Sequence, residues 1–500
     1  MICTVKGEQN HMARREELVE RLTHYNRALG APAEVLEKIA ALSSPQAHAV
    51  VTGQQPGLLT GPLYTIYKAL SAIVLAARLS QGGGGFVPIF WNHSEDHDLA
   101  EVDHLYLLQD NRPIKLEYPS LEADPEPKSV AEVPLDRERL ERIIAQIAAA
   151  TPESEFKSEI LDRLHELAGG SHDFGDLFSR LMLWLLGRRG LVLVEPRSLR
   201  ELMVPLFARL IEEPEATGRL INEAGERLRE GGQAPPLRQP ERFCNFFIDR
   251  RRAIWRDGRF SVDGRTYAKE ELLEFLQEEP HRFSSDVVTR PLIQDYLFPT
   301  YAYIAGPHEA AYLAQLEGVY RWFSLEPPRI VPRHRATLVE RRIRKILDRY
   351  APWADGLEDY RQPERLMRQI VSASTDLGPT FARCREEVDR ILREVQGYAS
   401  QIDPELRRPC AAARAKIAKV LDQLEAKVAK AKREREPLLK EQIYRAANHL
   451  FPLGQPQERV LNIVEFLIRH SPMLLEWVEE RFAGAEPGEH LVIDLPVGRA

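Results

Sequence analysis

Apolar residues are arranged in two alternating ways along residues 13–356. Some segments carry short uninterrupted apolar runs, which are typical of parallel strands buried on both faces. The segments between them repeat apolar residues every three or four positions, which is helical spacing, and one of these begins at Pro62. Strands that alternate with helices predict an α/β fold with a doubly wound parallel sheet. The five predicted strands are 47–53, 82–91, 188–196, 301–307 and 327–333.

Two insertions interrupt this sheet. Residues 111–187 predict a helical insertion. Residues 197–285 predict helices and a small β meander whose turns fall at "RDGR" and "VDGR". The sheet core is therefore expected in 13–110, 188–196 and 286–356.

The pattern changes after Trp353. Residues 357–455 are rich in Arg, Lys, Glu, Gln and Ala and predict an α-helical coiled-coil domain. Residues 401–406 break it into two arms, and Pro437 is expected to kink or end the second arm. Residues 456–500 predict a helix and a last strand that return to the core. The apolar seam that indicates the coiled coil consists of Ile417, Val420, Leu424, Val428 and Ala431.

Composition narrows the class of protein. The 500 residues are 44% hydrophobic and 29% charged, enough for a large core, and the net charge of −7 argues against a nucleic-acid binder. No apolar run reaches the length of a membrane span, which is about 20 residues. The N-terminus lacks the apolar segment of a signal peptide. Four widely spaced cysteines suggest neither a disulfide framework nor a zinc site. We therefore expect a cytoplasmic protein that binds neither nucleic acid nor membrane.

A glycine-rich loop follows the first predicted strand and precedes the helix at Pro62. Gly53, Gly57 and Gly61 can adopt positive φ and let the backbone approach a ligand closely. The helix would then present free N–H groups and its positive dipole end to an anion. The sequence lacks the spacing of a P-loop and of GxGxxG, so an ordinary glycine-rich connection is the alternative. Thr52, Gln54 and Gln55 add neutral hydrogen-bonding groups.

The most polar cluster, "WNHSEDHDLAEVDH" (91–104), follows the second predicted strand. Its position at the carboxyl end of a strand is where such sheets bind ligands. Three interpretations remain open: acid–base or substrate-binding chemistry by Glu95, Asp96, His97 and Asp98, a metal site that includes His93, or a solvated acidic loop. The spacing matches neither HExxH nor HxxEH, so we predict no metal site.

The same arrangement recurs after the fourth and fifth strands. Gly306 and Pro307 open a helix whose first turn holds Glu309, which either favours the helix dipole or faces a ligand. Arg333 follows the fifth strand and would suit an anion clamp, with a plain basic turn as the alternative. Upstream, "TRPLIQDYLFP" supplies Arg290, Gln294 and Asp295, and the arginine could pair with a carboxylate or phosphate.

These segments together resemble the bacillithiol-synthesis family BshC over residues 14–496. The resemblance rests on "VVTGQQPGLLTGPLYTIYKALSAI", "VPIFWNHSEDHDLAEVDH", "TRPLIQDYLFPTYAYIAGPHEAAYLAQL" and "QERVLNIVEFL". It implies a Rossmann-like core with two connecting insertions and a coiled coil used for homodimerisation. It also implies a cysteine ligase that joins L-cysteine to the amine of glucosaminyl-malate. Because an amide needs an activated carboxyl group, ATP and Mg²⁺ are candidate cofactors.

The resemblance carries site residues over by position. Matching positions in the first motif are Thr52, Gly53, Gln54, Gln55, Gly57, Gly61, Pro62, Tyr64, Tyr67 and Lys68; the later ones are Glu95, Asp96, His97, Asp98, Arg290, Pro291, Gln294, Asp295, Gly306, Pro307 and Glu309. Two features depart from the pattern: His93 stands where a small or apolar residue is expected, and the N-terminus is shorter than expected.

Two other functions remain open on sequence alone. One is a nucleotide-binding transferase or ligase of another pathway on the same fold. The other is an inactive coiled-coil scaffold. The apolar seam could be buried within one helical hairpin or between two chains, and the sequence does not distinguish these arrangements.

Overall fold

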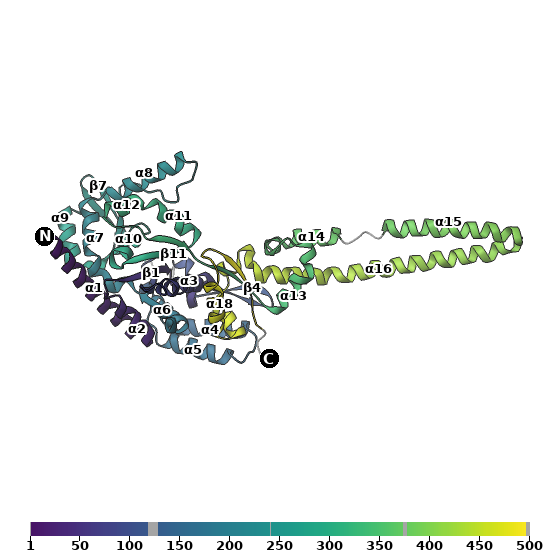
Figure 1. Cartoon of the computed structure of the whole chain (residues 1–500), viewed down its shortest axis with the longest axis horizontal. Helices are drawn as coiled ribbons and strands as arrows, with labels where there is room; N and C mark the ends of the chain where they lie inside the picture. The colour runs from purple at the N-terminus through teal and green to yellow at the C-terminus, as the bar shows by residue number, and fades with distance from the viewer. Residues whose placement is uncertain (1, 119–128, 241, 374–377, 497–500) are drawn as a thin grey trace. The chain divides into compact units, whose positions relative to one another are not determined.

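The computed structural model describes residues 2–118, 129–240, 242–373 and 378–496. They form two compact units, residues 1–338 with 456–500, and residues 339–455. The first unit is built on a five-stranded parallel sheet (Figure 1) in the order β12-β11-β1-β2-β5. Its strands are β1 (Ala47–Gln54), β2 (Gly85–Asn92), β5 (Val192–Val194), β11 (Thr300–Ala305) and β12 (Arg329–Pro332).

All five predicted strands pair in this sheet, so the predicted doubly wound fold is confirmed. Counted in chain order, the strands read 5-4-1-2-3 across the sheet. This is the strand order of a Rossmann-like fold. The second and third strands lie on one side of β1, and the fourth and fifth lie on its other side, so the strand order reverses beside β1. The reversal point lies between β1 and β11, and ligands of such sheets bind at the carboxyl ends of the strands there.

Helix α3 (Leu63–Ser80) connects β1 to β2 and is buried along most of its length. Val50 of β1 packs with Ala72 and Ala76 of this helix. By length and composition α3 could cross a membrane, but 67% of that window is buried inside the protein. Its apolar character is therefore explained by its place in the core.

In its described residues, 104–118 and 129–187, the first insertion with its approach contains a β hairpin and three α-helices. The hairpin was not predicted; its strands, β3 (His104–Gln109) and β4 (Arg112–Glu117), are antiparallel. Asp110 and Asn111 have positive φ in its two-residue turn, which these residue types tolerate. The helices are α4 (Arg137–Ala150), α5 (Lys157–Gly169) and α6 (Phe174–Leu186).

The second insertion contains the predicted meander, with turns at both DG sequences. A fifth strand completes this antiparallel sheet, whose order is β10-β6-β7-β8-β9. Its strands are β6 (Phe243–Ile248), β7 (Arg251–Arg256), β8 (Arg259–Val262), β9 (Arg265–Tyr267) and β10 (Phe283–Ser285). The accompanying helices are α7 (Arg200–Glu212), α8 (Ala216–Glu230) and α9 (Lys269–Glu278).

The remaining elements of the first unit flank the sheet or close the chain. Strand β14 returns, as predicted, and pairs with β13 (Arg335–Val339) in a separate two-stranded sheet. The remaining elements of the first unit, apart from β13, are α1 (Ile2–Ala28), α2 (Ala33–Ala41), α10 (Thr289–Leu297), α11 (Pro307–Gln315), α12 (Glu317–Trp322), α17 (Ile463–His470), α18 (Leu474–Ala483) and β14 (His490–Asp494).

The second unit is helical and contains α13 (Arg341–Tyr350), α14 (Pro363–Ala373), α15 (Gly378–Ile402) and α16 (Arg407–Leu450). Helices α15 and α16 form a long hairpin whose bend falls at the predicted break (Figure 1). Ion pairs join its arms, for example Arg385 with Asp422 at 3.1 Å. The prediction that Pro437 could end the second arm is wrong, because α16 continues through it to Leu450.

Candidate active site

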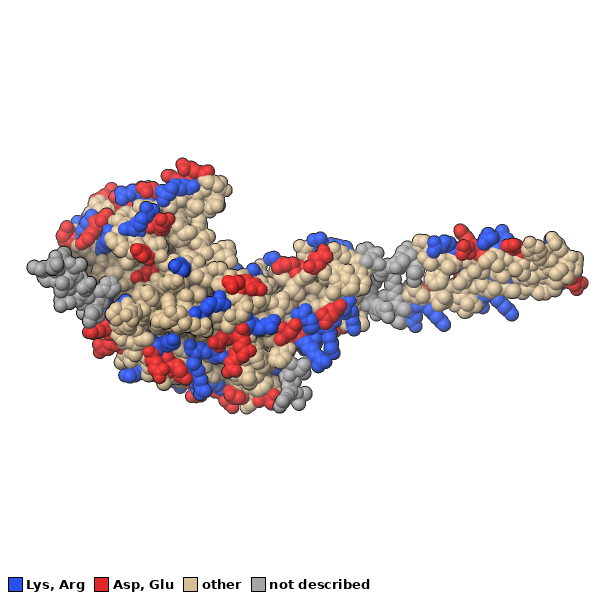
Figure 2. All heavy atoms as spheres, viewed as in Figure 1, with Lys and Arg blue, Asp and Glu red and all other residues tan. Residues whose placement is uncertain are grey.

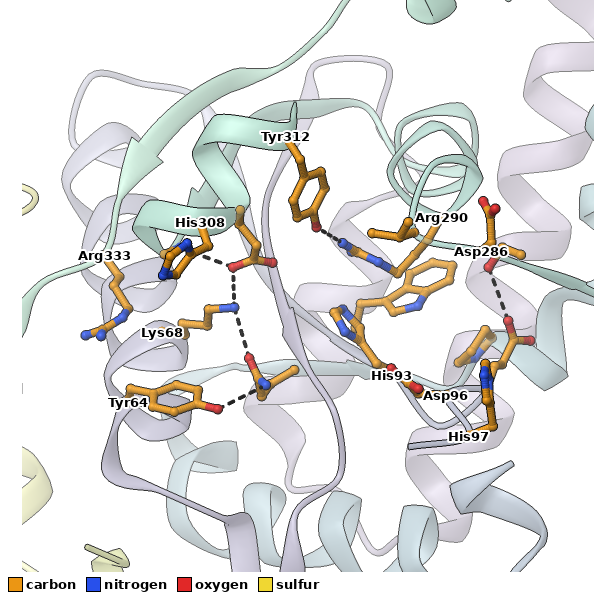
Figure 3. A pocket seen from close by; sticks show the side chains of 18 of the residues that line it. Tyr64, Lys68, His93, Asp96, His97, Asp286, Arg290, His308, Tyr312 and Arg333 are labelled. Carbon is orange, nitrogen blue, oxygen red and sulfur yellow. Dashed lines mark hydrogen bonds and ion pairs between the residues drawn. The ribbon is translucent and has the colours of Figure 1, made fainter. Parts of the chain in front are cut away.

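A cavity of about 470 Å³ opens at the carboxyl edge of the parallel sheet, within the first unit. Residues that follow β1, β2, β11 and β12 all line it, so it lies at the point where the strand order of the sheet reverses. Of the predicted site residues, the structure brings eleven to this cavity: Gln54, Tyr64, Lys68, Glu95, Asp96, His97, Arg290, Gly306, Pro307, Glu309 and Arg333. Figure 3 shows their arrangement.

A buried ion pair joins the two sides of the reversal point. The Nζ atom of Lys68, on α3, contacts Glu309 on α11 and donates to the Gly53 carbonyl oxygen at 2.9 Å. Burial opposes both charges. It lowers the pKa of Lys68, although Glu309 counteracts it, while Lys68 and Arg290 hold the pKa of Glu309 below its ordinary value despite burial. Glu309 is therefore ionised at neutral pH and fixes Lys68 at the cavity wall.

Arg290 is a buried cation whose partners are neutral. Its guanidinium donates to Gln294 at 3.1 Å and contacts the hydroxyl oxygens of Tyr303 at 3.3 Å and Tyr312 at 2.6 Å. It forms an ion pair with none of the described carboxylates, and Figure 3 shows it directed into the cavity. A buried charge normally has a paired counterion. Arg290 is thus suited to an anionic group of a ligand.

His93 also lines the cavity, although the sequence argument considered it only as a metal ligand and predicted no metal site. Its Nε2 atom is buried and has no hydrogen-bond partner among the described residues. Burial lowers its pKa well below 6.5, and the nearby charges of Arg290 and Lys68 add to this effect. The imidazole is therefore neutral at pH 7 and can accept a hydrogen bond from a ligand. The signal that could have found it is its place at the end of a buried strand.

The predicted cluster of residues 95–98 does not act as one group. Asp96 lines the cavity and accepts a hydrogen bond from Gln55 at 2.7 Å. His97 is exposed at the rim, edge-on to the ring of Phe247. Glu95 is buried against Arg200, and burial raises its pKa. Asp98 is exposed and lies outside the cavity lining.

The glycine loop has a different backbone geometry from the one predicted. Of its three glycines only Gly61 has positive φ, at 66°, while the non-glycine residues Leu59 and Thr60 have φ of 46° and 79°. Gly57 packs against Gly61, where an added Cβ would lie 2.9 Å from the Cα atom. The glycines therefore permit a tight, strained turn, and their role in binding a ligand stays a prediction.

The N-terminus of α3 also makes a hydrogen bond within the protein. The Leu63 N–H donates to the Leu461 carbonyl oxygen at 2.9 Å, and Pro62 forms a β-bridge with Asn462. The prediction of a free helix N-terminus is therefore wrong at this N–H. Gln55, Gly57, Gly61 and Pro62 line a neighbouring recess instead, which shares Gln54 and Tyr64 with the main cavity.

Two residues of β1 and its loop serve the sheet itself. Thr52 is buried and its hydroxyl donates to the Ile304 carbonyl oxygen at 3.0 Å, which ties β1 to β11. A Cβ added to Gly53 would lie 2.5 Å from Nε2 of His93, so only glycine lets that imidazole pack here.

Three further predicted residues support the cavity through their neighbours. Gln294 is buried against Arg290, and Asp295 accepts a hydrogen bond from Tyr320. Arg333 lines the cavity, but both of its terminal nitrogens donate to Glu458, at 2.8 and 3.0 Å. Glu458 also contacts Arg335 at 3.3 Å, so one carboxylate serves two arginines, and the anion clamp at Arg333 stays a prediction.

Several lining residues come from segments that the sequence argument did not connect with the site. Arg252 lies on the meander, contacts Asp286 at 2.8 Å and covers the ring of Phe247. The alternation of apolar and polar residues along the meander does not indicate that one of its faces lies at the cavity of the parallel sheet. The other unpredicted polar residues of the lining are His308, Tyr312, Ser285 and Arg459.

Comparison with known proteins identifies the family. Residues 3–334 match the model described as bacillithiol biosynthesis BshC, N-terminal Rossmann-like domain, and residues 336–495 match its C-terminal coiled-coil domain. The chain belongs to the BshC family. A Salinibacter ruber protein named "Putative cysteine ligase BshC" is 35% identical over 486 residues, which are 93% of this chain and 86% of that protein. Proteins of the same name from Geobacillus thermodenitrificans and Chlorobaculum tepidum are 33% and 32% identical, covering 95% and 96% of this chain and 89% of each relative.

The BshC assignment agrees with the resemblance inferred from the sequence motifs. The two family models meet between residues 334 and 336, and the second compact unit begins at Val339. The cavity residues therefore all fall in the BshC Rossmann-like domain or in the C-terminal segment that returns to it.

Proposed function

We propose that this BshC-family chain is a ligase that joins the carboxyl group of L-cysteine to the amine of glucosaminyl-malate. The names of its relatives support ligation with cysteine. The observation that carries the proposal is Arg290, a buried guanidinium at the cavity without a carboxylate partner among the described residues. A malate group offers two carboxylates, and arginine binds carboxylates with paired N–H donors.

The reacting amine needs an acceptor for its proton. His97 was the sequence candidate, but it is exposed at the rim. His93 is a better candidate because its imidazole is neutral at pH 7 and its Nε2 atom is buried without a partner among the described residues. We therefore assign His93 to hold the sugar amine and receive its proton, with Asp96 as a predicted carboxylate of the same lining.

The cofactors belong to the same proposal. Amide formation needs an activated carboxyl group, so we propose ATP and Mg²⁺. The described residues contain no cluster of three or more His, Cys, Asp or Glu side chains that could hold a metal. Mg²⁺ is commonly held by one or two carboxylates together with substrate phosphates, and Asp96 fits that role. A bound nucleotide would supply the leaving group for carboxyl activation.

A second copy of the chain is the proposed protein partner. The seam residues Ile417, Val420 and Leu424 are 38%, 61% and 50% exposed, so the hairpin itself does not bury them. The side chain of Ala431, also in that seam, lies outside the described side chains. On the other arm, Val395, Tyr398 and Ile402 are 51%, 63% and 83% exposed at the same spacing. In Figure 2 uncharged surface runs along the hairpin between its charged margins. Such spacing is typical of a helical seam that packs against another chain.

We place the reaction in the cytoplasm, as the sequence indicated. Membership of a small-molecule biosynthesis family supports this, and Cys244, Cys384 and Cys410 are free thiols. Neither nucleic acid nor membrane is a proposed partner, in keeping with the net charge of −7.

Purified protein incubated with glucosaminyl-malate, cysteine, ATP and Mg²⁺ tests the ligase function. Product mass and nucleotide consumption are followed together. The expected result is the bacillithiol mass with a matching amount of ADP or AMP, and its loss in His93→Ala. Folded protein that forms no product would contradict the assignment. A product formed from another amine in a parallel acceptor screen would instead favour a ligase of another pathway.

A further inference from the structure

A second cavity, of about 450 Å³, shares Glu95 with the candidate active site. Four arginines line it: Arg197, Arg200, Arg250 and Arg282. The lining also contains three carboxylates, and Arg197 pairs with Glu195, which lies outside the lining. Nothing in the family assignment or in the ligase chemistry above gives this cavity a role.

Arg200 is the residue that points to a ligand. It is 8% exposed and begins helix α7. Its Nη2 atom pairs with Glu95, but Nε and Nη1 are buried and have no hydrogen-bond partner in the part of the chain that the structure describes. Burying donors without hydrogen-bond partners is costly. Each of the two nitrogens forms a bidentate fork with Nη2, the atom that pairs with Glu95, so an oxyanion that binds such a fork competes with Glu95.

The other three arginines are already held in place by carboxylates. Arg197 contacts Glu195 at 3.0 Å, and Arg250 contacts Glu132 at 2.8 Å. Arg282 donates to Asp249 at 2.9 Å. They are fixed parts of the wall, while Arg200 alone among the four has two buried nitrogens without a hydrogen-bond partner among the described residues. The cavity is thus preorganised around one guanidinium.

We propose that this cavity binds the oxyanion of a phosphate or carboxylate ligand through Arg200, in competition with Glu95. An incoming oxyanion would take the unmade donors and weaken the Arg200–Glu95 pair. Because Glu95 also lines the active-site cavity, binding in one cavity would change the charge presented to the other. The binding site itself does not depend on the proposed ligase activity.

Isothermal titration of the full chain with inorganic phosphate, and separately with malate, tests this binding. We expect saturable binding of at least one anion, weakened by about tenfold or more in Arg200→Met, because charge-assisted bonds to arginine are strong. Arg250→Met, at the partly exposed rim, should weaken binding more modestly. Glu95→Gln should tighten it, because the competing carboxylate is removed. Phosphate and malate in separate arms distinguish a phosphoryl from a carboxylate ligand.

Arg290→Met is the control, because Arg290 lines only the active-site cavity and is the residue proposed to bind a carboxylate there. Loss of binding in Arg290→Met with full binding in Arg200→Met would place the anion in the active-site cavity and overturn the proposal. Absence of saturable binding of both anions would also overturn it. If Arg200→Met does not fold, Arg250→Met and Glu95→Gln decide through their opposite expected shifts.

Discussion

Arg290 is a buried guanidinium whose hydrogen-bond partners are all neutral. If it binds a carboxylate of the substrate, Arg290→Met removes a charged hydrogen bond worth about 1.5–3 kcal/mol. We expect the KM for glucosaminyl-malate to rise roughly 10- to 100-fold. Steady-state kinetics measures this, and circular dichroism checks the fold. Arg321→Met is the control, since that arginine is 70% exposed on α12. An unchanged KM in folded Arg290→Met would contradict the role.

Asp295 makes stability depend on pH. Burial raises its pKa from 3.8 to about 7. Below pH 3.8 it is protonated in both the folded and unfolded states. Between about pH 4 and 7 the folded state binds more protons, so the free energy of unfolding falls as pH rises, by roughly 4 kcal/mol in total from this group. Above pH 7 its contribution is constant.

Asp295→Asn should abolish this dependence. The difference in unfolding free energy between the variant and the natural chain should therefore grow from pH 4 to pH 7 and level off above it, with the variant favoured at the higher pH. Urea unfolding at several pH values measures this difference. A difference that does not change with pH would show that the carboxyl group titrates normally.

Packing between β1 and β2 gives a prediction at the level of elements. An alanine Cβ at Gly53 would lie 2.5 Å from the His93 imidazole and 2.6 Å from the Trp91 carbonyl oxygen. Overpacking of this kind costs about 1–3 kcal/mol. We expect Gly53→Ala to lower the melting temperature by several degrees and to reduce activity by displacing His93.

Gly85 supplies a matched control at the other end of the same strand pair. It is paired with Ala47, and an added Cβ would meet only the Ala47 Cα, at 4.0 Å. Gly85→Ala should therefore melt within about a degree of the natural chain, because this is ordinary van der Waals contact. Equal losses in both variants would show that the backbone, rather than the contact with His93, sets the effect.

The elements differ in how far the sequence could predict them. The five core strands were predictable because each is a short apolar run between helical patterns. The β3–β4 hairpin was missed because its turn at Asp110 and Asn111 lacks the glycine that marks such turns. Pro437 was expected to interrupt α16, yet the helix continues through it. Local residue preferences describe each segment but not the packing that overrides them.

The sequence could predict only those residues of the candidate site that follow the strands of the parallel sheet. Strand ends converge by topology, which explains why Gln54, Asp96 and Glu309, which end or follow strands, line one cavity. Lys68 was expected there only from the family resemblance. Contacts made by insertions are not encoded in any periodicity. The pairing of Arg333 with Glu458, and the contribution of Arg252 and Asp286, depend on segments distant in sequence.

Assembly is the property of the whole molecule that the structure makes testable. The sequence left open whether the hairpin buries its own seam. In the structure Ile417, Val420 and Leu424 on α16 and Val395, Tyr398 and Ile402 on α15 are exposed, at spacings of three and four residues along each helix, while Val428 is half-buried. Exposed apolar stripes of this type are unfavourable in water unless another chain covers them. A dimer through α15 and α16 would cover both stripes at once.

Placing charge in the stripes tests this directly. We expect the natural chain to be a dimer by light scattering, and Tyr398→Glu with Val420→Glu to be monomeric, because burying unpaired carboxylates costs several kcal/mol. Lys419→Glu is the control: it adds negative charge beside Val420 at an exposed polar position and should remain dimeric. Circular dichroism must show unchanged helix content in the monomeric variant. A natural chain that stays monomeric at micromolar concentration, or a charged variant that still dimerises, would mean that these stripes do not form the interface. A monomeric variant that keeps ligase activity would further place the whole reaction within one chain, since the cavity residues come only from the first unit.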